Sequence, residues 1–260
     1  MPAKSSRLAS AVTACVMALM LCGAVVASAA EIVVASGRGF RPVLDALAGE
    51  FERATGHKVV TSYGTGKAIR DRVLNGEIVD LVILPRPLVD ELAQQNKVVA
   101  TSIVDIAHSE VAMGVRSGTP KPDITSSAAF KRSLLAAKSI VCSDPSIGAT
   151  TSAYFTSALE RLGIADQVRP KIRFVSDAHT AEYVARGEVE IAVQLANELL
   201  AVPGIEVVPL PPEFQTKDFV FAAAIASAAK DVKSAADLIL FLSAPAAIPM
   251  IKAKHLEPGG

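Results

Sequence analysis

The sequence predicts an α/β fold of two lobes, each a mostly parallel sheet flanked by helices. Two observations support this prediction. Short apolar runs alternate with amphipathic stretches in two separate blocks of the chain, which is typical of parallel sheets covered by helices. The blocks are separated by Ile103–Val115, which reads as a long extended crossing, and by the turn-rich Gly118–Pro122.

The first block reads as three strands, each followed by a helix. Short apolar or β-branched runs predict the strands, which lie at Ile32–Ala35, Lys58–Tyr63 and Asp80–Leu84. Apolar residues at helical spacing predict the helices, which lie at Val43–Phe51, Ile69–Leu74 and Leu88–Gln95. Gly56 and Gly76 follow the first two helices, and a glycine commonly ends a helix.

The second block repeats this pattern, and the chain then returns to the first. Its strands are predicted at Ser139–Cys142, Ile172–Val175 and Ile191–Gln194, and its helices at Ser126–Ala136, Thr151–Leu162 and Thr180–Arg186. Pro209–Pro212 reads as a loop, followed by a strand at Phe219–Ile225 and helices at Ser234–Leu242 and Ala246–Lys254. We therefore expect residues 31–110 and 221–260 in lobe one and residues 111–220 in lobe two, with the ligand cleft between the lobes.

The N-terminus has the pattern of a secretory signal peptide. Lys4 and Arg7 precede Leu8–Val26, a run of apolar and small residues without charge, and the small residues Ala27–Ala30 follow it. A membrane anchor is the alternative, because the run is nearly as long as a membrane span. We expect residues 1–30 to be removed on export to the periplasm.

Composition and charge exclude several classes of protein. The 260 residues include 26 Lys and Arg and 26 Asp and Glu, so the basic surplus that favours nucleic-acid binding is absent. A hydrophobic share of 51% predicts a packed core. Cys142 is the one cysteine outside the leader and is expected to be buried in a strand. Neither it nor the four His residues has metal-ligand spacing, so we expect no metal and no cofactor.

Residues that follow the first two strands are candidates for anion binding. In open α/β sheets the ligand lies outside the carboxyl ends of the strands. Arg38 and Gly39 follow the first strand, and Thr65, Gly66 and Lys67 follow the second. Backbone N–H groups at the start of a helix can hold an anion, and an arginine adds a charged fork. An ordinary turn is the alternative, since both motifs lack the full spacing of a dinucleotide or ATP loop.

Polar residues also follow the strands of the second block. Thr151 and Ser152 belong to a row of three hydroxyl residues at a predicted helix start, where capping needs only one. Asp177 and His179 stand between a strand and a helix. Asp177 reads as a cap, and His179 as an anion contact, a proton carrier or a solvated side chain. Gln194 ends an apolar strand and is expected to point into the cleft.

Seven short segments together resemble a known family. Each is weak alone, but their order and spacing match along nearly the whole chain after the leader: Ala48–Val59, Tyr63–Gly66, Asn75–Ile83, Ser143–Pro145, Ala158–Gly163, Val184–Glu190 and Phe241–Pro245. The chain is similar to the periplasmic solute-binding proteins of ABC transporters, in the molybdate-binding branch. The resemblance implies a type II periplasmic binding protein with a hinge, a small anion as ligand, an ABC permease as partner and a monomeric state.

At the ligand site the chain departs from that family. The resemblance implies ligand contacts at or near Gly39, Gly66, Thr151, Asp177 and Leu195, the last beside Gln194. The family's two ligand serines and its ligand tyrosine are therefore replaced, while backbone N–H donors are retained. Basic residues stand close by in the sequence, at Arg38, Lys67 and His179. They favour a larger anion such as a carboxylate over molybdate.

The wider family also includes periplasmic aconitate isomerases, which gives an enzymatic alternative. Moving an allylic proton on a tricarboxylate needs basic groups for the carboxylates and one residue that carries the proton. His179 is the first candidate for this catalytic role, and Tyr63 and Tyr154 are others. Because no catalytic dyad is visible and the fold alone does not decide, we rank anion binding first and isomerisation second.

Overall fold

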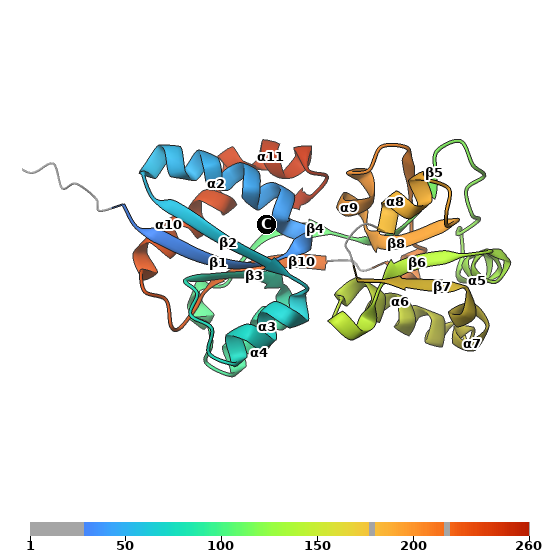
Figure 1. Cartoon of the computed structure of the whole chain (residues 1–260), viewed down its shortest axis with the longest axis horizontal. Coiled ribbons are helices and arrows are strands. Elements are labelled where there is room, and N and C mark those ends of the chain that lie inside the picture. Colours follow the sequence, from blue (N-terminus) through green and yellow to red (C-terminus); the bar gives the residue numbers. More distant parts are fainter. Residues whose placement is uncertain (1–28, 177–179, 216–218, 260) are drawn as a thin grey trace, which may run out of the picture.

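The structure, a computed structural model, describes residues 29–176, 180–215 and 219–259. The chain forms two lobes side by side, each with one sheet between layers of helices (Figure 1). We call the lobe with the six-stranded sheet the first lobe and the lobe with the five-stranded sheet the second lobe. The predicted two-lobed α/β fold is confirmed.

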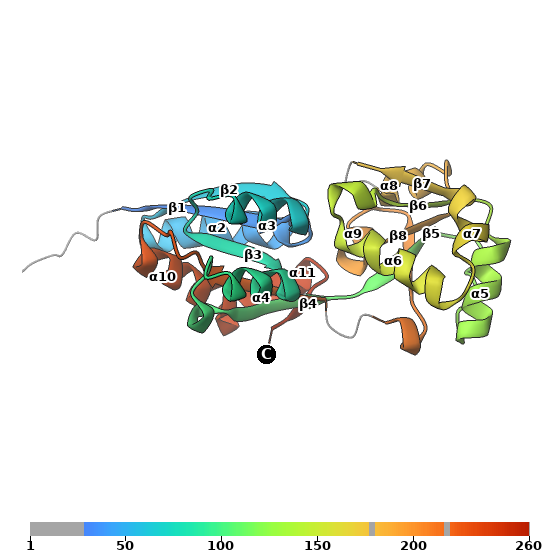
Figure 2. The ribbon, with the colours of Figure 1, turned by 90° about the horizontal axis from the view of Figure 1, so that it is seen from below.

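The first lobe has the strand order β11-β4-β10-β3-β1-β2. Its strands are β1 (Glu31–Gly37), β2 (Lys58–Gly64), β3 (Leu81–Pro85), β4 (Val104–Ser109), β10 (Phe219–Ile225) and β11 (Glu257–Pro258). Its helices are α2 (Arg41–Thr55), α3 (Gly66–Leu74), α4 (Arg86–Gln94), α10 (Val232–Ser243) and α11 (Ile248–Ala253). Helices α2, α10 and α11 cover one face of the sheet and α3 and α4 the other (Figures 1 and 2).

Strand residues of the first lobe alternate between two apolar cores. Ile32 and Val34 of β1 belong to the core under α2, whereas Ala35 belongs to the core under α3 and α4. This alternation follows from the two-residue period of a strand. Gly56 ends α2 in the left-handed conformation with φ +77°, and its N–H donates to the carbonyl oxygen of Glu52. The predicted glycine stop is therefore confirmed.

The second lobe has the strand order β7-β6-β8-β5-β9. Its strands are β5 (Val111–Arg116), β6 (Ile140–Ser143), β7 (Ile172–Val175), β8 (Ile191–Leu195) and β9 (Ile205–Pro209). Its helices are α5 (Ser127–Ala136), α6 (Thr150–Arg161), α7 (Ala165–Val168), α8 (Thr180–Ala185) and α9 (Ala196–Leu200). Cys142 is buried in this sheet as predicted, and burial raises the pKa of its thiol to about 12.

Both sheets are mixed, which corrects the expectation of mostly parallel sheets. Strand β1 pairs in parallel with β2 and β3, and β6 with β7 and β8. Strand β10 is antiparallel to β3 and β4, and β5 is antiparallel to β8 and β9. The cause lies in the connections between the lobes. A strand that enters a lobe from the cleft runs opposite to strands whose carboxyl ends face the cleft, and β5 and β10 are these entering strands.

The sequence patterns do not predict some of the short strands and helices that the structure describes. Strand β9 has five residues at a sheet edge and ends in a proline-rich segment, so its alternation is brief. Helix α9 also has five residues, too few for helical spacing to be visible. The omission of α9 matters most, because this helix lies at the cleft.

The two C-terminal helices pack on the first lobe. Leu238 and Leu242 of α10 and Ile251 of α11 are buried in its core. In the part of the chain that the structure describes, no single helix is long and apolar enough to span a membrane. Helices α10 and α11 are long and apolar enough only when they are counted together, and the chain bends by 56° where the two meet.

Candidate functional site

A cavity of about 70 Å³ lies between the lobes, where the carboxyl ends of β1, β2, β3, β6 and β8 meet. Its wall consists of Gly37, Arg38, Gly39, Gly64, Thr65, Gly66, Pro85, Phe219 and Phe221 from the first lobe and Ser143, Ile147, Ala149, Thr150, Thr151, Gln194, Leu195 and Glu198 from the second. Strand β10 contributes its first residues, because it enters the first lobe from the cleft. The cavity is thus at the place where ligands of α/β sheets bind.

Arg38 and Gly39 form a single turn of 3-10 helix between β1 and α2. Gly39 is packed so closely that a Cβ there would lie 2.8 Å from Cζ of Phe221 and 2.9 Å from Cδ1 of Leu195. Leu195 belongs to the second lobe, so this glycine allows the two lobes to approach. Arg38 is the one cation among the described residues that line the cavity.

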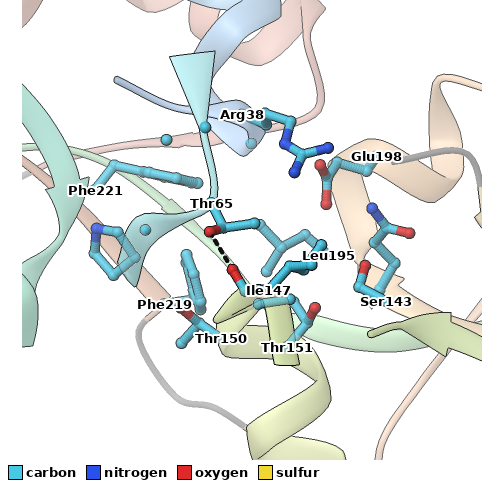
Figure 3. A pocket seen from close by; sticks show the side chains of 17 residues that line it. Arg38, Thr65, Ser143, Ile147, Thr150, Thr151, Leu195, Glu198, Phe219 and Phe221 are labelled. Carbon is cyan, nitrogen blue, oxygen red and sulfur yellow. Dashed lines mark hydrogen bonds between the residues drawn. The ribbon is translucent and has the colours of Figure 1, made fainter. Parts of the chain in front are cut away.

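Thr65 connects the two lobes and also begins a helix. Its Oγ1 donates to the carbonyl oxygen of Ile147 in the second lobe at 2.6 Å (Figure 3). The same oxygen accepts a hydrogen bond of 3.3 Å from the N–H of Ala68, which caps α3. The first N–H groups of a helix have no partner within it, so α3 presents donors beside the cavity from Gly66 onward.

The second lobe adds the start of another helix and an amide. Thr150 and Thr151 form the first positions of α6, whose N-terminus lies at the cavity. Gln194 is buried at the end of β8 and its Oε1 accepts a hydrogen bond from Oγ1 of Thr180. The second lobe therefore offers hydroxyl groups, an amide and helix N–H groups to a ligand.

Further contacts close the cleft. Nδ2 of Asn197 donates to the carbonyl oxygen of Gly39 at 3.0 Å, and Oγ of Ser109 donates to Oδ1 of Asn197 at 2.9 Å. Asn197 is buried and lies on α9 of the second lobe. Together with the bond from Thr65, these contacts hold the lobes directly against each other.

Glu198 is a residue of the cavity that the sequence analysis missed. It lies on α9, is partly buried, and its carboxyl group points toward the guanidinium of Arg38, which belongs to the first lobe (Figure 3). Burial raises the pKa of its carboxyl group, whereas the Gln194 side chain, the Arg38 charge and the backbone at Leu195 act in the opposite direction. A signal was present in the sequence, because Glu198 stands just after the strand that ends with Gln194 and Leu195.

The predicted site residues fall into three groups. Six of them line the cavity: Arg38, Gly39, Thr65, Gly66, Thr151 and Gln194. Lys67 and Ser152 do not. Lys67 is exposed and its stem lies against Gly148, and buried Ser152 donates from Oγ to the carbonyl oxygen of Ala149 at 2.9 Å. Asp177 and His179 lie outside the described residues.

The two tyrosines considered as proton carriers lie away from the cavity wall. The hydroxyl of Tyr63 donates to Asp45, and burial is the main cause that raises the pKa of Tyr63. The hydroxyl of Tyr154 donates to the carbonyl oxygen of Phe214 at 2.5 Å. Among the described residues, no group of three or more His, Cys, Asp or Glu side chains is placed to hold a metal ion.

The fold and the cavity define a two-lobed solute-binding protein, and comparisons with known proteins agree. The family of bacterial extracellular solute-binding proteins matches residues 32–257. An aconitate isomerase from Pseudomonas sp is 32% identical over 232 residues, which cover 87% of each chain. A molybdate-binding protein from Azotobacter vinelandii is 26% identical over 240 residues, covering 87% of this chain and 90% of the relative.

A solved structure supports the same conclusion for the fold. The periplasmic molybdate-binding protein of Azotobacter vinelandii superposes with a TM-score of 0.70 at 21% identity, covering 86% of this chain and 98% of the other. At this identity the likeness concerns the fold alone. The match to residues 32–257 spans most of the sequence, so the chain belongs to the bacterial extracellular solute-binding protein family.

Proposed function

We propose that this protein is a periplasmic binding protein for a small anion, either an oxyanion or a small carboxylate. The observation that carries the proposal is Arg38, which lines the cavity between the lobes together with the N-termini of α3 and α6. Helix N-termini and an arginine fork both favour negative charge. Thr65, Thr151 and Gln194 add uncharged donors, so several of the residues expected at the site share one cavity.

The volume of the cavity favours a compact ligand. A single water needs about 10–15 Å³ of such space, so about 70 Å³ accommodates only a few heavy atoms. A tricarboxylate would require the lobes to open slightly. We propose that they do so by a hinge, with residues 31–110 and 221–260 moving against residues 111–220. Small-angle scattering with and without ligand tests this, because a rigid molecule gives the same profile in both states.

A thermal-shift panel of oxyanions, dicarboxylates and tricarboxylates tests the choice of ligand. A ligand at a hundredfold excess over its Kd stabilises the folded state by about 2.7 kcal/mol. We expect at least one anion of the panel to raise the melting temperature, whereas neutral sugars do not. If only sugars or amino acids raised it, the proposal of an anion site would be wrong.

We further propose export to the periplasm and cooperation with an ABC permease. The basic start, apolar run and small residues of 1–30 support a cleaved signal peptide. Family membership supports the same location, and we propose a monomeric binding protein that delivers its ligand to a membrane partner. Intact-mass analysis of the secreted protein is expected to give a chain that starts near Ala30, and a mass that retains residues 1–29 contradicts this.

A second candidate function is aconitate isomerisation. Two observations favour it: the 32% identity to an aconitate isomerase, and the carboxyl group of Glu198 inside a cavity that otherwise suits anions. Incubation of the purified protein with trans-aconitate, followed by NMR, tests this function. Appearance of cis-aconitate supports an enzyme, and an unchanged spectrum in the presence of demonstrated binding leaves a binding protein.

A further inference from the structure

Glu198 is the feature of the cavity that anion binding leaves unexplained. Its carboxyl group lies on the wall and points toward the guanidinium of Arg38 from the other lobe (Figure 3). In its ionised form this carboxyl group repels any anion that enters, and the repulsion is stronger in a partly dry site than in water. A carboxylate at this place therefore lowers the affinity of a simple anion-binding protein, which indicates that it has another task.

The other polar side chains among the described wall residues are poorly suited to carrying a proton. They are the guanidinium of Arg38, the hydroxyls of Thr65, Ser143, Thr150 and Thr151, and the amide of Gln194. None of these groups changes its protonation state near neutral pH. Tyr63 and Tyr154 are engaged by other partners away from the wall. Glu198 thus supplies the one carboxyl group among the described wall residues.

We propose that Glu198 is the catalytic residue that carries a proton during a 1,3-shift on a bound allylic polycarboxylate. The inference rests on the isomerase alternative stated above. In the first step the C–H bond of the methylene group breaks and its proton moves to a carboxylate oxygen of Glu198. The electron pair of that bond enters the allylic system and the double bond moves by one position. In the second step Glu198 returns a proton to the former vinyl carbon. No oxidant, reductant or co-reactant is needed.

The surroundings of Glu198 fit this task. Arg38, which lines the same cavity, is suited to hold a substrate carboxylate and to stabilise the negative charge that builds up on it while the proton is away. Hydrogen bonds from the Gln194 side chain and from the backbone at Leu195 hold the carboxyl group in place. Burial raises the pKa of Glu198, and a general base works best when its pKa approaches the working pH.

Substitution of Glu198, with separate measurements of binding and turnover, tests the inference. The full chain after the leader is compared with Glu198→Gln, Glu198→Asp and His179→Ala, and Glu213→Gln is the matched control because Glu213 is exposed and outside the cavity wall. Calorimetric titration with trans-aconitate gives Kd. NMR in D2O gives both the rate of interconversion and the exchange of methylene protons for deuterium. Thermal melts show whether each variant is folded.

In Glu198→Gln we expect unchanged or tighter binding of trans-aconitate, because a negative charge is removed, and a loss of about 10²- to 10⁴-fold in interconversion and deuterium exchange. Glu198→Asp retains part of the rate, and Glu213→Gln retains all of it. A merely structural role would instead weaken binding together with turnover.

Three results contradict the proposal in different ways. If the wild type does not bind trans-aconitate, the isomerase function fails and the role of Glu198 falls with it. If the wild type binds without interconversion or exchange, anion binding stands and the catalytic role is wrong. If Glu198→Gln turns over at the wild-type rate while His179→Ala does not, the enzyme stands and the proton carrier is His179.

Discussion

The first-lobe wall and the second-lobe wall of the cavity offer a ligand different kinds of group. The described residues of the first-lobe wall include four glycines, at Gly37, Gly39, Gly64 and Gly66, and one charged residue, Arg38. The second-lobe wall contains hydroxyl side chains, the amide of Gln194 and the carboxyl group of Glu198, and no glycine among its described residues. The backbone N–H groups of the glycines change position only when the fold changes, whereas each side chain can be altered by a single substitution.

This difference assigns the walls different tasks. We propose that the first-lobe wall, which is closely packed at Gly39, is a fixed platform for negative charge against which the second lobe closes. We further propose that the second-lobe wall decides which anion is held and whether it is converted. Substitutions in the first-lobe wall are therefore expected to lower the affinity for all anions, and those in the second-lobe wall to change selectivity or turnover.

The largest effect is expected when Gly39 receives a side chain. Its Cβ would lie 2.9 Å from Leu195 of the second lobe, and overpacking of this kind costs about 1–3 kcal/mol before the methyl groups of valine are added. In Gly39→Val we expect binding of trans-aconitate to weaken by more than about 100-fold by calorimetry. Gly49→Val is the control, because a Cβ at Gly49 meets nothing within 4 Å. Equal affinities in the two variants would show that the first-lobe wall is not a fixed platform.

Removal of Arg38, the one cation among the described wall residues, comes next. A hydrogen bond to a charged group contributes about 1.5–3 kcal/mol, so Arg38→Gln is expected to weaken binding of every anion by about 10- to 150-fold. Arg41→Gln is the matched control, since Arg41 pairs with Asp45 at 3.1 Å on the surface of α2. A loss confined to one anion of the panel would instead assign Arg38 to selectivity and remove the distinction between the walls.

Sequence patterns predict the first-lobe wall better than the second. Glycine-rich turns after two strands point directly to Gly39 and Gly66, because strand, turn and helix follow one another along the chain. Glu198 is not predicted from the sequence, for two reasons. Helix α9 is too short to show helical spacing, and a search for cations and hydroxyls passes over an acid.

It is also hard to predict that a residue lines the cavity when its strand enters the lobe from a distant part of the chain. Phe219 and Phe221 line the cavity because β10 enters the first lobe from the cleft and pairs antiparallel with β3, opposite Pro85. The strand itself is predicted correctly from its apolar run, but its direction depends on the path of the chain between the lobes. Lys67 shows the reverse case, since it follows a strand and yet turns outward along Gly148.

A smaller effect is expected from the contact that joins the two walls. The hydroxyl of Thr65 donates to Ile147 across the cleft, and one neutral hydrogen bond contributes about 0.5–1.5 kcal/mol. Thr65→Val is therefore expected to weaken anion binding by about two- to tenfold by favouring the open conformation. In the control, Thr119→Val, a hydroxyl that donates to the carbonyl oxygen of Arg116 at 2.6 Å within one turn is removed. An equal loss of affinity in both variants would mean that the bond across the cleft plays no part in closure.

The smallest effect concerns the stability of the second-lobe wall itself. The pKa of Glu198 is raised in the folded state, so the folded protein holds this proton more tightly than the unfolded chain does. Its contribution to stability is present below the unfolded pKa of about 4.3 and is lost as the pH rises through the folded pKa. Glu198→Gln is therefore expected to gain stability over the wild type as the pH is raised from 4 to 8, as measured by urea unfolding.

Glu188 provides a control of opposite sign in the same lobe. Its hydrogen bond from Arg186 lowers the pKa of its carboxyl group, so its contribution to stability is present above the unfolded pKa and is lost as the pH falls through the folded pKa. Glu188→Gln is expected to be slightly less stable than the wild type at pH 7, with the difference vanishing in acid. If Glu198→Gln showed this same trend, the carboxyl group at the cavity would stabilise the wall. A role in proton transfer would then no longer be needed to explain its position.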